Sequence, residues 1–255
     1  MTSFSVIGAG NLGANLIHSL QKSGNQLISI YKRSKYPQFK DKVENDLDKV
    51  ISLSDVIFIS VQESRIADVV SEISLLHNLS GKIFFHTSNA LTSDEMVILK
   101  EKGAQIASFY PLQTFPDFKG DPNVFNGIYF LSEGDRFALK AADRIAGALN
   151  AFNLIVDKST KMFFHIGAVI SSNFLNSLIK FSDIQVKKGG DFNYKVLLPL
   201  IKQTLMNIEN RGLDKALTGP ASRGESEIIK QHLDLLEGKE KDLYELLTGL
   251  ISGRP

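Results

Sequence analysis

Apolar residues in the first 156 positions form short runs, separated by stretches with apolar positions at helical spacing. Nearly continuous apolar runs are typical of strands buried on both faces of a parallel sheet. Their alternation with helices predicts a doubly wound α/β architecture. The expected strands are Phe4–Ile7, Gln26–Tyr31, Asp55–Val61, Lys82–Phe85, Ala104–Phe109, Phe125–Leu131 and Phe152–Val156, and the clearest helices are Ala14–Lys22 and Asp135–Leu149.

The pattern changes at Lys158, beyond which we expect helices and no strand. We therefore predict an all-helical domain over residues 157–255, following an α/β domain over residues 1–156. The longest expected helix, Thr160–Lys187, carries more apolar residues than one buried face needs, which predicts a homodimer through the helical domain. The other expected helices are Tyr194–Glu209, Ser226–Leu236 and Lys239–Ile251.

A glycine-rich turn joins the first expected strand to the first expected helix. Gly8 allows a tight exit from the strand, Gly10 leaves room for a pyrophosphate, and Gly13 lets the helix pack closely on the strand. The helix N-terminus directs unpaired N–H groups and a positive dipole end toward the phosphates. The turn predicts a Rossmann-type dinucleotide site rather than a purely structural glycine turn, and its residues are Gly8, Gly10, Asn11, Leu12 and Gly13.

The second expected strand ends in Lys32, Arg33 and Ser34. An NAD-preferring site usually has an acidic residue here, bonded to the ribose 2′-hydroxyl. Two cations and a hydroxyl instead suit a 2′-phosphate, because Arg can hold it with forked, charge-assisted bonds. We therefore predict NADP as the cofactor, the alternative being a solvated basic loop.

Polar side chains also follow the later strands of the α/β domain. Ligands of open α/β sheets bind at the carboxyl ends of the strands, so these side chains are expected to border the cofactor and the substrate. Each could also serve a structural role, and the loop after Tyr110 could simply cover the sheet edge. The residues expected beside the cofactor are Ser60, Val61 and Gln62, and those expected beside the substrate are His86, Ser88, Tyr110 and Gln113.

The helical half adds a second group of candidates. His165 and Ser172 are seven residues apart, so they share a helix face, with Asn173 close by. Thr218 and Arg223 belong to a turn-rich segment between helices, where Arg223 could bind an anion.

Composition limits the class of protein. A net charge of +1 argues against nucleic-acid binding, and no apolar run approaches the ~18 residues that span a bilayer. The chain has no cysteine, which excludes disulfides and cysteine zinc sites. We expect a cytoplasmic protein with no resident metal and no membrane partner.

Five segments spread over nearly the whole chain carry a resemblance to a known family. They are Val6–Gly13, His86–Ser88, Pro111–Phe115, Phe164–Leu175 and Leu217–Gly224. The chain resembles Rossmann-like proteins that join an N-terminal NADP-oxidoreductase-type domain to a helical C-terminal domain of uncharacterised function. The wider group is similar to pyrroline-5-carboxylate reductase, ketopantoate reductase and deazaflavin-dependent NADP oxidoreductase, and it implies an NADP domain followed by a helical domain that often dimerises.

The chain departs from the family pattern at two positions. Asn89 stands where the family commonly has Gly, and Tyr110 stands where it commonly has His. Related hydroxyacid dehydrogenases use a helix lysine as the acid, whereas the matching stretch here has His165 and no later lysine before Lys180.

Together these features predict an NADPH-dependent reductase of a small polar C=O or C=N compound, bound in the cleft between the domains. His165 or Tyr110 is the expected proton donor. Ser88, Gln113 and Asn173 are expected to position the substrate, and Arg223 to anchor a carboxylate. The alternative is a non-catalytic NADP-binding redox sensor or dimeric scaffold.

Overall fold

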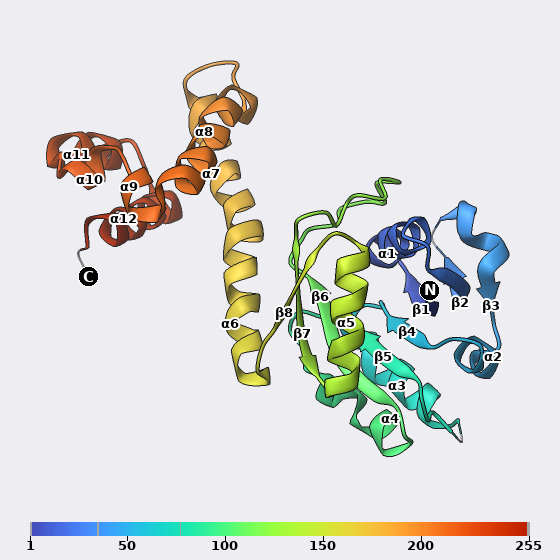
Figure 1. Ribbon diagram of the computed structural model, residues 1–255. Coiled ribbons are helices and arrows are strands. Elements are labelled where there is room, and N and C mark those ends of the chain that lie inside the picture. The colour runs from blue at the N-terminus through green and yellow to red at the C-terminus, as the bar shows by residue number, and fades with distance from the viewer. Residues whose placement is uncertain (1, 35, 77, 254–255) are drawn as a thin grey trace. The chain divides into compact units, whose positions relative to one another are not determined.

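The computed structural model describes residues 2–34, 36–76 and 78–253, except for the side chains of residues 32–34. The chain divides into two compact units between Ser172 and Asn173. All eight strands of the sheet belong to the first unit (Figure 1). The expected domain boundary at residue 156 stays a prediction; in the structure Lys158–Ser172 belong to the first unit.

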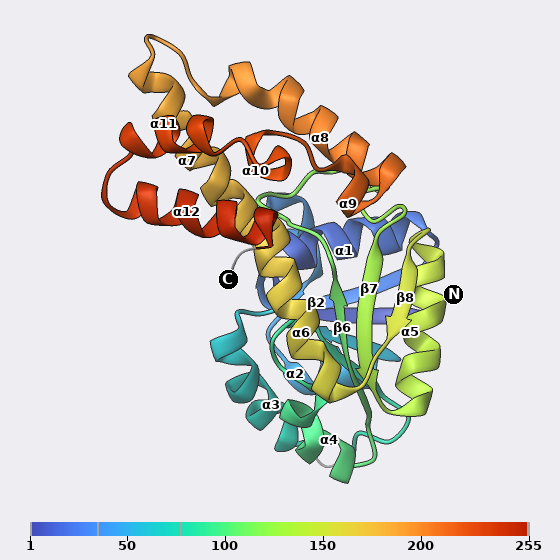
Figure 2. The same ribbon diagram turned by 90° about the vertical axis from the view of Figure 1, so that its left-hand side faces the viewer.

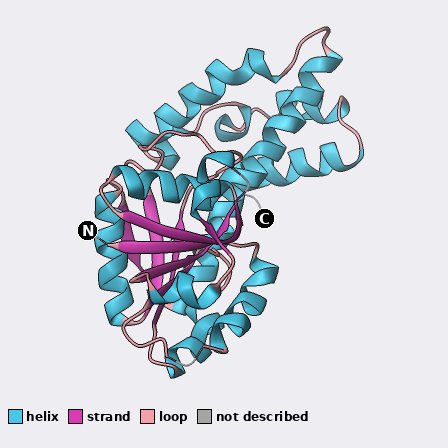
Figure 3. Ribbon diagram, turned by 90° about the vertical axis from the view of Figure 1, so that its right-hand side faces the viewer, coloured by secondary structure: helices cyan, strands magenta, loops and turns pink. Residues whose placement is uncertain are grey.

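The sheet of the first unit is mostly parallel, with strand order β3-β2-β1-β4-β5-β6-β7-β8. Only the pair β6–β7 is antiparallel. Figure 3 shows the strands with helices on both faces of the sheet. The strands are β1 (Ser3–Ala9), β2 (Gln26–Ser34), β3 (Val43–Glu44), β4 (Val56–Ile59), β5 (Ile83–His86), β6 (Gln105–Pro111), β7 (Tyr129–Gly134) and β8 (Phe152–Ile155).

The helices of the first unit lie between these strands, apart from α6, which follows the last one. They are α1 (Asn11–Lys22), α2 (Leu47–Ser52), α3 (Ile66–Ser74), α4 (Val97–Glu101), α5 (Arg136–Ala148) and α6 (Lys158–Val169), with short 3-10 turns at Pro37–Lys42, Glu63–Arg65 and Ser93–Met96. A π-helical turn, Ile170–Phe174, joins α6 to α7 (Leu175–Lys188).

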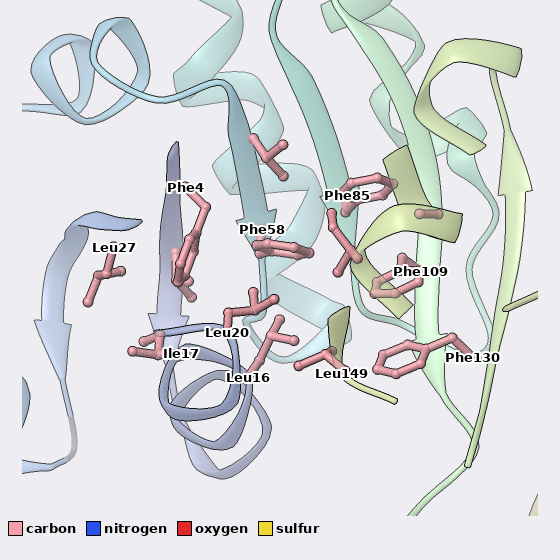
Figure 4. Close-up of a cluster of buried hydrophobic side chains, with 14 of the residues drawn as sticks. Phe4, Leu16, Ile17, Leu20, Leu27, Phe58, Phe85, Phe109, Phe130 and Leu149 are labelled. Atoms are coloured by element: carbon pink, nitrogen blue, oxygen red, sulfur yellow. The ribbon is translucent and has the colours of Figure 1, made fainter. Parts of the chain in front are cut away.

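Each face of the sheet has its own apolar core. One core packs α1 and α5 on alternate strand residues such as Phe4, Phe58 and Phe109 (Figure 4). The other packs α2, α3 and α4 on the residues between them, such as Ile57 and Phe84. Because the strands are buried on both faces of the sheet, their sequences are nearly continuous apolar runs.

One expected strand begins later than its pattern predicts. β7 starts at Tyr129, because Phe125 instead packs its ring against Phe115 and Phe130, with centroids 5.3 and 5.5 Å apart. A turn around it is closed by the bond from the Asn126 amide to the Asn123 carbonyl. Burying one large aromatic ring therefore outweighs extending the strand.

The described residues of the second unit form helices joined by turns and loops, with no strand. Its helices after α7 are α8 (Leu198–Arg211), α9 (Leu213–Ala216), α10 (Pro220–Arg223), α11 (Ser226–Asp234) and α12 (Gly238–Ser252), with a 3-10 turn at Tyr194–Leu197. Among described residues 173–253, Leu236 alone is buried. This unit therefore contains almost no core of its own.

The helical stretch Lys158–Lys188 is 31 residues long and, by length and composition alone, apolar enough to cross a membrane. The expectation that no apolar run reaches such a length is therefore wrong. A single helix of this kind is weak evidence for a span. Its first part, α6, lies against the sheet of the first unit (Figure 2), where Lys161 bonds to Ser108 of β6.

Candidate active site

The glycine turn after β1 has the geometry that a dinucleotide requires. Gly8 has a φ of +96°, and a Cβ there would lie 2.7 Å from the Ser60 carbonyl oxygen. A Cβ on Gly13 would lie 2.4 Å from the Gly8 carbonyl oxygen, so α1 packs directly on the turn. A Cβ on Gly10, at the N-cap of α1, would meet nothing within 4 Å. The space beside Gly10 is therefore open at the helix N-terminus, as a pyrophosphate needs.

A cavity of about 1150 Å³ opens at this turn, along the carboxyl ends of β1, β4 and β5. Its walls come from the turn itself, from the residues after β4 and β5, from α3, and from Tyr110 and His165. Ten residues predicted from the sequence line it: Gly8, Gly10, Asn11, Leu12, Ser60, Val61, Gln62, Ser88, Tyr110 and His165.

Other predicted residues lie elsewhere. The exposed Gln113 does not line the cavity, and its side chain accepts a bond from the Thr114 amide. The side chains of Lys32, Arg33 and Ser34 lie outside the described part of the chain. Asn173, Thr218 and Arg223 belong to the second unit, so their relation to the cavity stays a prediction. The Arg223 guanidinium forms a forked ion pair with Glu225, at 2.6 and 3.0 Å.

Ser88, Tyr110 and His165 share the cavity with a carboxylate that the sequence analysis missed. Glu63 accepts the Ser88 hydroxyl at 2.5 Å. Burial raises the pKa of Tyr110, and the Glu63 charge raises it further. The signal for Glu63 was its place directly after Gln62, at the end of the β4 segment, where ligands of an α/β sheet bind.

His165 approaches the cavity from α6. Its Nδ1 atom is buried and has no hydrogen-bond partner among the described residues. Packing of the helix, rather than a hydrogen bond to Nδ1, therefore holds the ring in place. A buried polar atom without a partner is uncommon in a native structure and is often found where a residue has a catalytic role.

His86 is not among the residues that line the cavity, and its predicted contact with substrate stays a prediction. The ring is fully buried; Nε2 lies 2.9 Å from the Thr92 carbonyl oxygen, and Nδ1 accepts the Ser88 amide at 3.2 Å. These contacts describe a neutral ring that donates from Nε2. The pKa of His86 is lowered to about 3, mainly by burial and secondly by the nearby positive charge of Lys161. His86 therefore shapes the loop that carries Ser88.

A buried lysine lies near His86. Lys161 of α6 is 1% exposed and donates to the Leu91 carbonyl and to the Ser108 hydroxyl. Its Nζ atom lies 3.7 Å from Glu133 Oε1, and the Glu133 side chain is 2% exposed. Burial lowers the pKa of Lys161 to about 8, against the raising effect of Glu133. Sequence reasoning missed this residue; the available signal was a cation four residues before His165, within a largely apolar helix.

Two family models match separate parts of the chain. Residues 3–90 match "NADP oxidoreductase coenzyme F420-dependent". The N-terminal domain is an NADP oxidoreductase domain. Residues 128–251 match "Domain of unknown function (DUF2520)". The chain is thus an NADP-dependent oxidoreductase whose C-terminal domain has no assigned role. No curated protein matches it significantly.

Solved structures resemble this oxidoreductase over nearly its whole length. A Bacteroides fragilis protein described as an NADP oxidoreductase is 27% identical, with a TM-score of 0.79, over 99% of this chain and 98% of that one. A Thermotoga maritima protein is 22% identical, with a TM-score of 0.73, over 98% and 97%. Plasmodium falciparum pyrroline carboxylate reductase with NADP bound is 12% identical, with a TM-score of 0.65, over 99% and 97%. At identities of 22% and 12%, the Thermotoga maritima and Plasmodium falciparum structures show a similarity in fold alone.

Proposed function

We propose that this oxidoreductase uses NADPH to reduce a small polar compound with a C=O or C=N bond, at the Ser88–Tyr110–His165 end of the cavity. The observation that carries this proposal is that the three polar side chains line the same cavity as the glycine turn. A cavity that contained only apolar side chains at that end would instead favour a sensor.

The order of the sheet supports this choice of end. In a Rossmann domain the adenosine ribose lies at the end of β2 and the pyrophosphate at the turn after β1. The rest of the cofactor then extends toward β4, β5 and β6, where Glu63, Ser88 and Tyr110 lie. NADPH supplies the hydride when bound.

The chain's own residues would orient the acceptor and move a proton. Tyr110 lines the cavity and carries a phenolic proton that it can donate to the acceptor. His165 is the other candidate donor, because its side chain lines the same cavity from α6. Ser88, held by Glu63, would position the reacting group. A proton donor at this place contributes roughly 10²–10⁴-fold to the rate.

The carboxylate favours C=N substrates within this class. Glu63 stabilises a positive charge nearby, and a protonated imine carries one. The similarity in fold to a pyrroline carboxylate reductase agrees, since a pyrroline ring contains a C=N bond. That the substrate binds in the cleft between the domains stays a prediction.

The test is NADPH oxidation, followed by absorbance, against a panel of keto acids, cyclic imines and a deazaflavin. We expect turnover of at least one cyclic imine, and its loss in His165→Ala with NADPH binding retained. An inactive panel with tight NADPH binding would favour the sensor. Full activity in both His165→Ala and Tyr110→Phe would contradict the assignment of the donor.

We further propose that a second copy of the chain covers the helical unit. Helices need a buried apolar face for stability, yet Leu236 alone is buried among described residues 173–253. Large apolar side chains such as Leu205, Leu246 and Leu250 are 51%, 62% and 72% exposed.

A cytoplasmic location also remains a prediction.

A further inference from the structure

Lys161 joins α6 to three separate parts of the first unit. Its ammonium group donates to the Leu91 carbonyl, which lies in the loop after β5, and to Ser108 of β6. It also pairs with Glu133 of β7 at 3.7 Å. Glu133 is held in turn by Ser93, whose amide and hydroxyl each donate at 2.7 Å. Such a set of bonds leaves the lysine side chain one orientation.

The position of Lys161 on the helix determines where His165 points. Residues four apart lie on the same helix face, about 6 Å apart along the axis. Fixing Lys161 against the sheet therefore fixes the rotation of α6 that turns His165 to the cavity. His165 Nδ1 has no partner among the described residues, so no hydrogen bond of that atom helps to orient the ring.

The same lysine also supports the loop that carries Ser88. The loop is held at its start by His86, which accepts the Ser88 amide, and at its end by the contact between His86 and Thr92. The bond from Lys161 to the Leu91 carbonyl holds the segment between these points. The ammonium group of Lys161 thus supports two sides of the cavity, the one that carries His165 and the one that carries Ser88.

We propose that Lys161 is a positioning residue, which through Leu91, Ser108 and Glu133 turns His165 toward the cavity and holds the Ser88 loop in place. This inference rests on the proposed function for its kinetic consequence, but the orientation of His165 can be measured without a substrate. No role in touching substrate or cofactor is assigned to Lys161, which does not line the cavity.

The test compares the full chain with the double variant Lys161→Met/Glu133→Gln. Removing the lysine alone would leave a buried carboxylate unpaired and could prevent folding, whereas the double variant removes both charges. The readout is the imidazole NMR signal of His165, one of five histidines, assigned with His165→Gln. In the unaltered protein we expect this signal to shift when NADPH is added.

In the double variant we expect NADPH affinity within about twofold of the original, and loss of the NADPH-dependent shift of His165. On the substrate found by the panel, kcat should fall roughly 100-fold, because a displacement near 1 Å costs that much. Lys158→Met is the matched control: Lys158 lies three residues before Lys161 on the same helix, is exposed, and pairs with Asp94 on the surface.

A folded double variant in which His165 still responds to NADPH would overturn the proposal, as would an unaltered protein in which it never responds. A panel without any turnover would count against the proposed function alone, since the NMR comparison needs no substrate.

Discussion

Lys161 and Glu133 form a buried ion pair between α6 and β7, with Nζ 3.7 Å from Oε1 and exposed fractions of 1% and 2%. Desolvating two charges costs several kcal/mol, and only well-placed hydrogen bonds offset that cost. Ser93, Ser108 and the Leu91 carbonyl provide them.

The first prediction concerns this pair and stability. Lys161→Met should lower the free energy of unfolding by about 3–5 kcal/mol, because it leaves Glu133 buried without a counter-charge. Lys161→Met/Glu133→Gln should recover most of that loss. Denaturant unfolding of the two single variants and the double variant measures the coupling, and additive losses would contradict it.

The second prediction concerns acid. His86 has a folded-state pKa of about 3, below its ordinary 6.5, so between these values the unfolded chain binds a proton that the folded one does not. The free energy of unfolding should therefore fall as the pH drops from 6.5 toward 3, by up to about 5 kcal/mol from this group. His86→Gln should flatten this part of the stability profile, while His232→Gln in the second unit should leave it unchanged. Equal slopes in all three proteins would refute the assignment.

The third prediction separates two glycines of the turn. Gly13→Ala should destabilise the fold by about 1–3 kcal/mol, because its Cβ would lie 2.4 Å from the Gly8 carbonyl oxygen. Gly10→Ala meets nothing within 4 Å, so its stability should change by less than about 1 kcal/mol. Its NADPH affinity should nevertheless fall at least about tenfold, since the methyl group occupies the approach to the pyrophosphate. Thermal unfolding and NADPH titration of both variants check this, and tight binding by Gly10→Ala would contradict the location of the pyrophosphate.

The fourth prediction concerns the choice of cofactor. Arg33→Ala should weaken NADPH binding by roughly 1.5–3 kcal/mol, the value of a hydrogen bond to a charged group, while NADH binding stays the same. Lys22→Ala, in the last turn of α1, serves as the control for a lost surface charge. Fluorescence titration with both cofactors is the measurement. Unchanged NADPH affinity together with equal NADH affinity would exclude a 2′-phosphate contact at Arg33.

The fifth prediction concerns assembly. Light scattering at micromolar concentration should give twice the chain mass of 28.2 kDa. Leu246→Glu/Leu250→Glu should shift the protein toward monomer, because charging an apolar interface costs several kcal/mol. Lys239→Glu, at the start of the same helix, controls for charge alone. A monomeric mass for the unaltered protein would contradict a dimer.

Local patterns predicted most of the first unit. Apolar runs located the buried strands, and the spacing of Gly8, Gly10 and Gly13 predicted the turn and the cavity beside it. The start of β7 was predicted too early, because packing of Phe125 against rings distant in sequence competes with strand propensity there.

The amino-acid sequence by itself determined the α/β alternation, the dinucleotide turn and the cofactor class, since each depends on residues that are neighbours along the chain. Only the tertiary structure decided which polar residues meet. Ser108 and Glu133 face each other because β6 and β7 pair antiparallel, and Lys161 reaches both from a helix 28 residues further on. The tertiary structure also buried His86, which does not line the cavity, and brought Glu63 to Ser88. The physical reason is that sheet order and helix rotation, which periodicity does not encode, determine which side chains share a buried space.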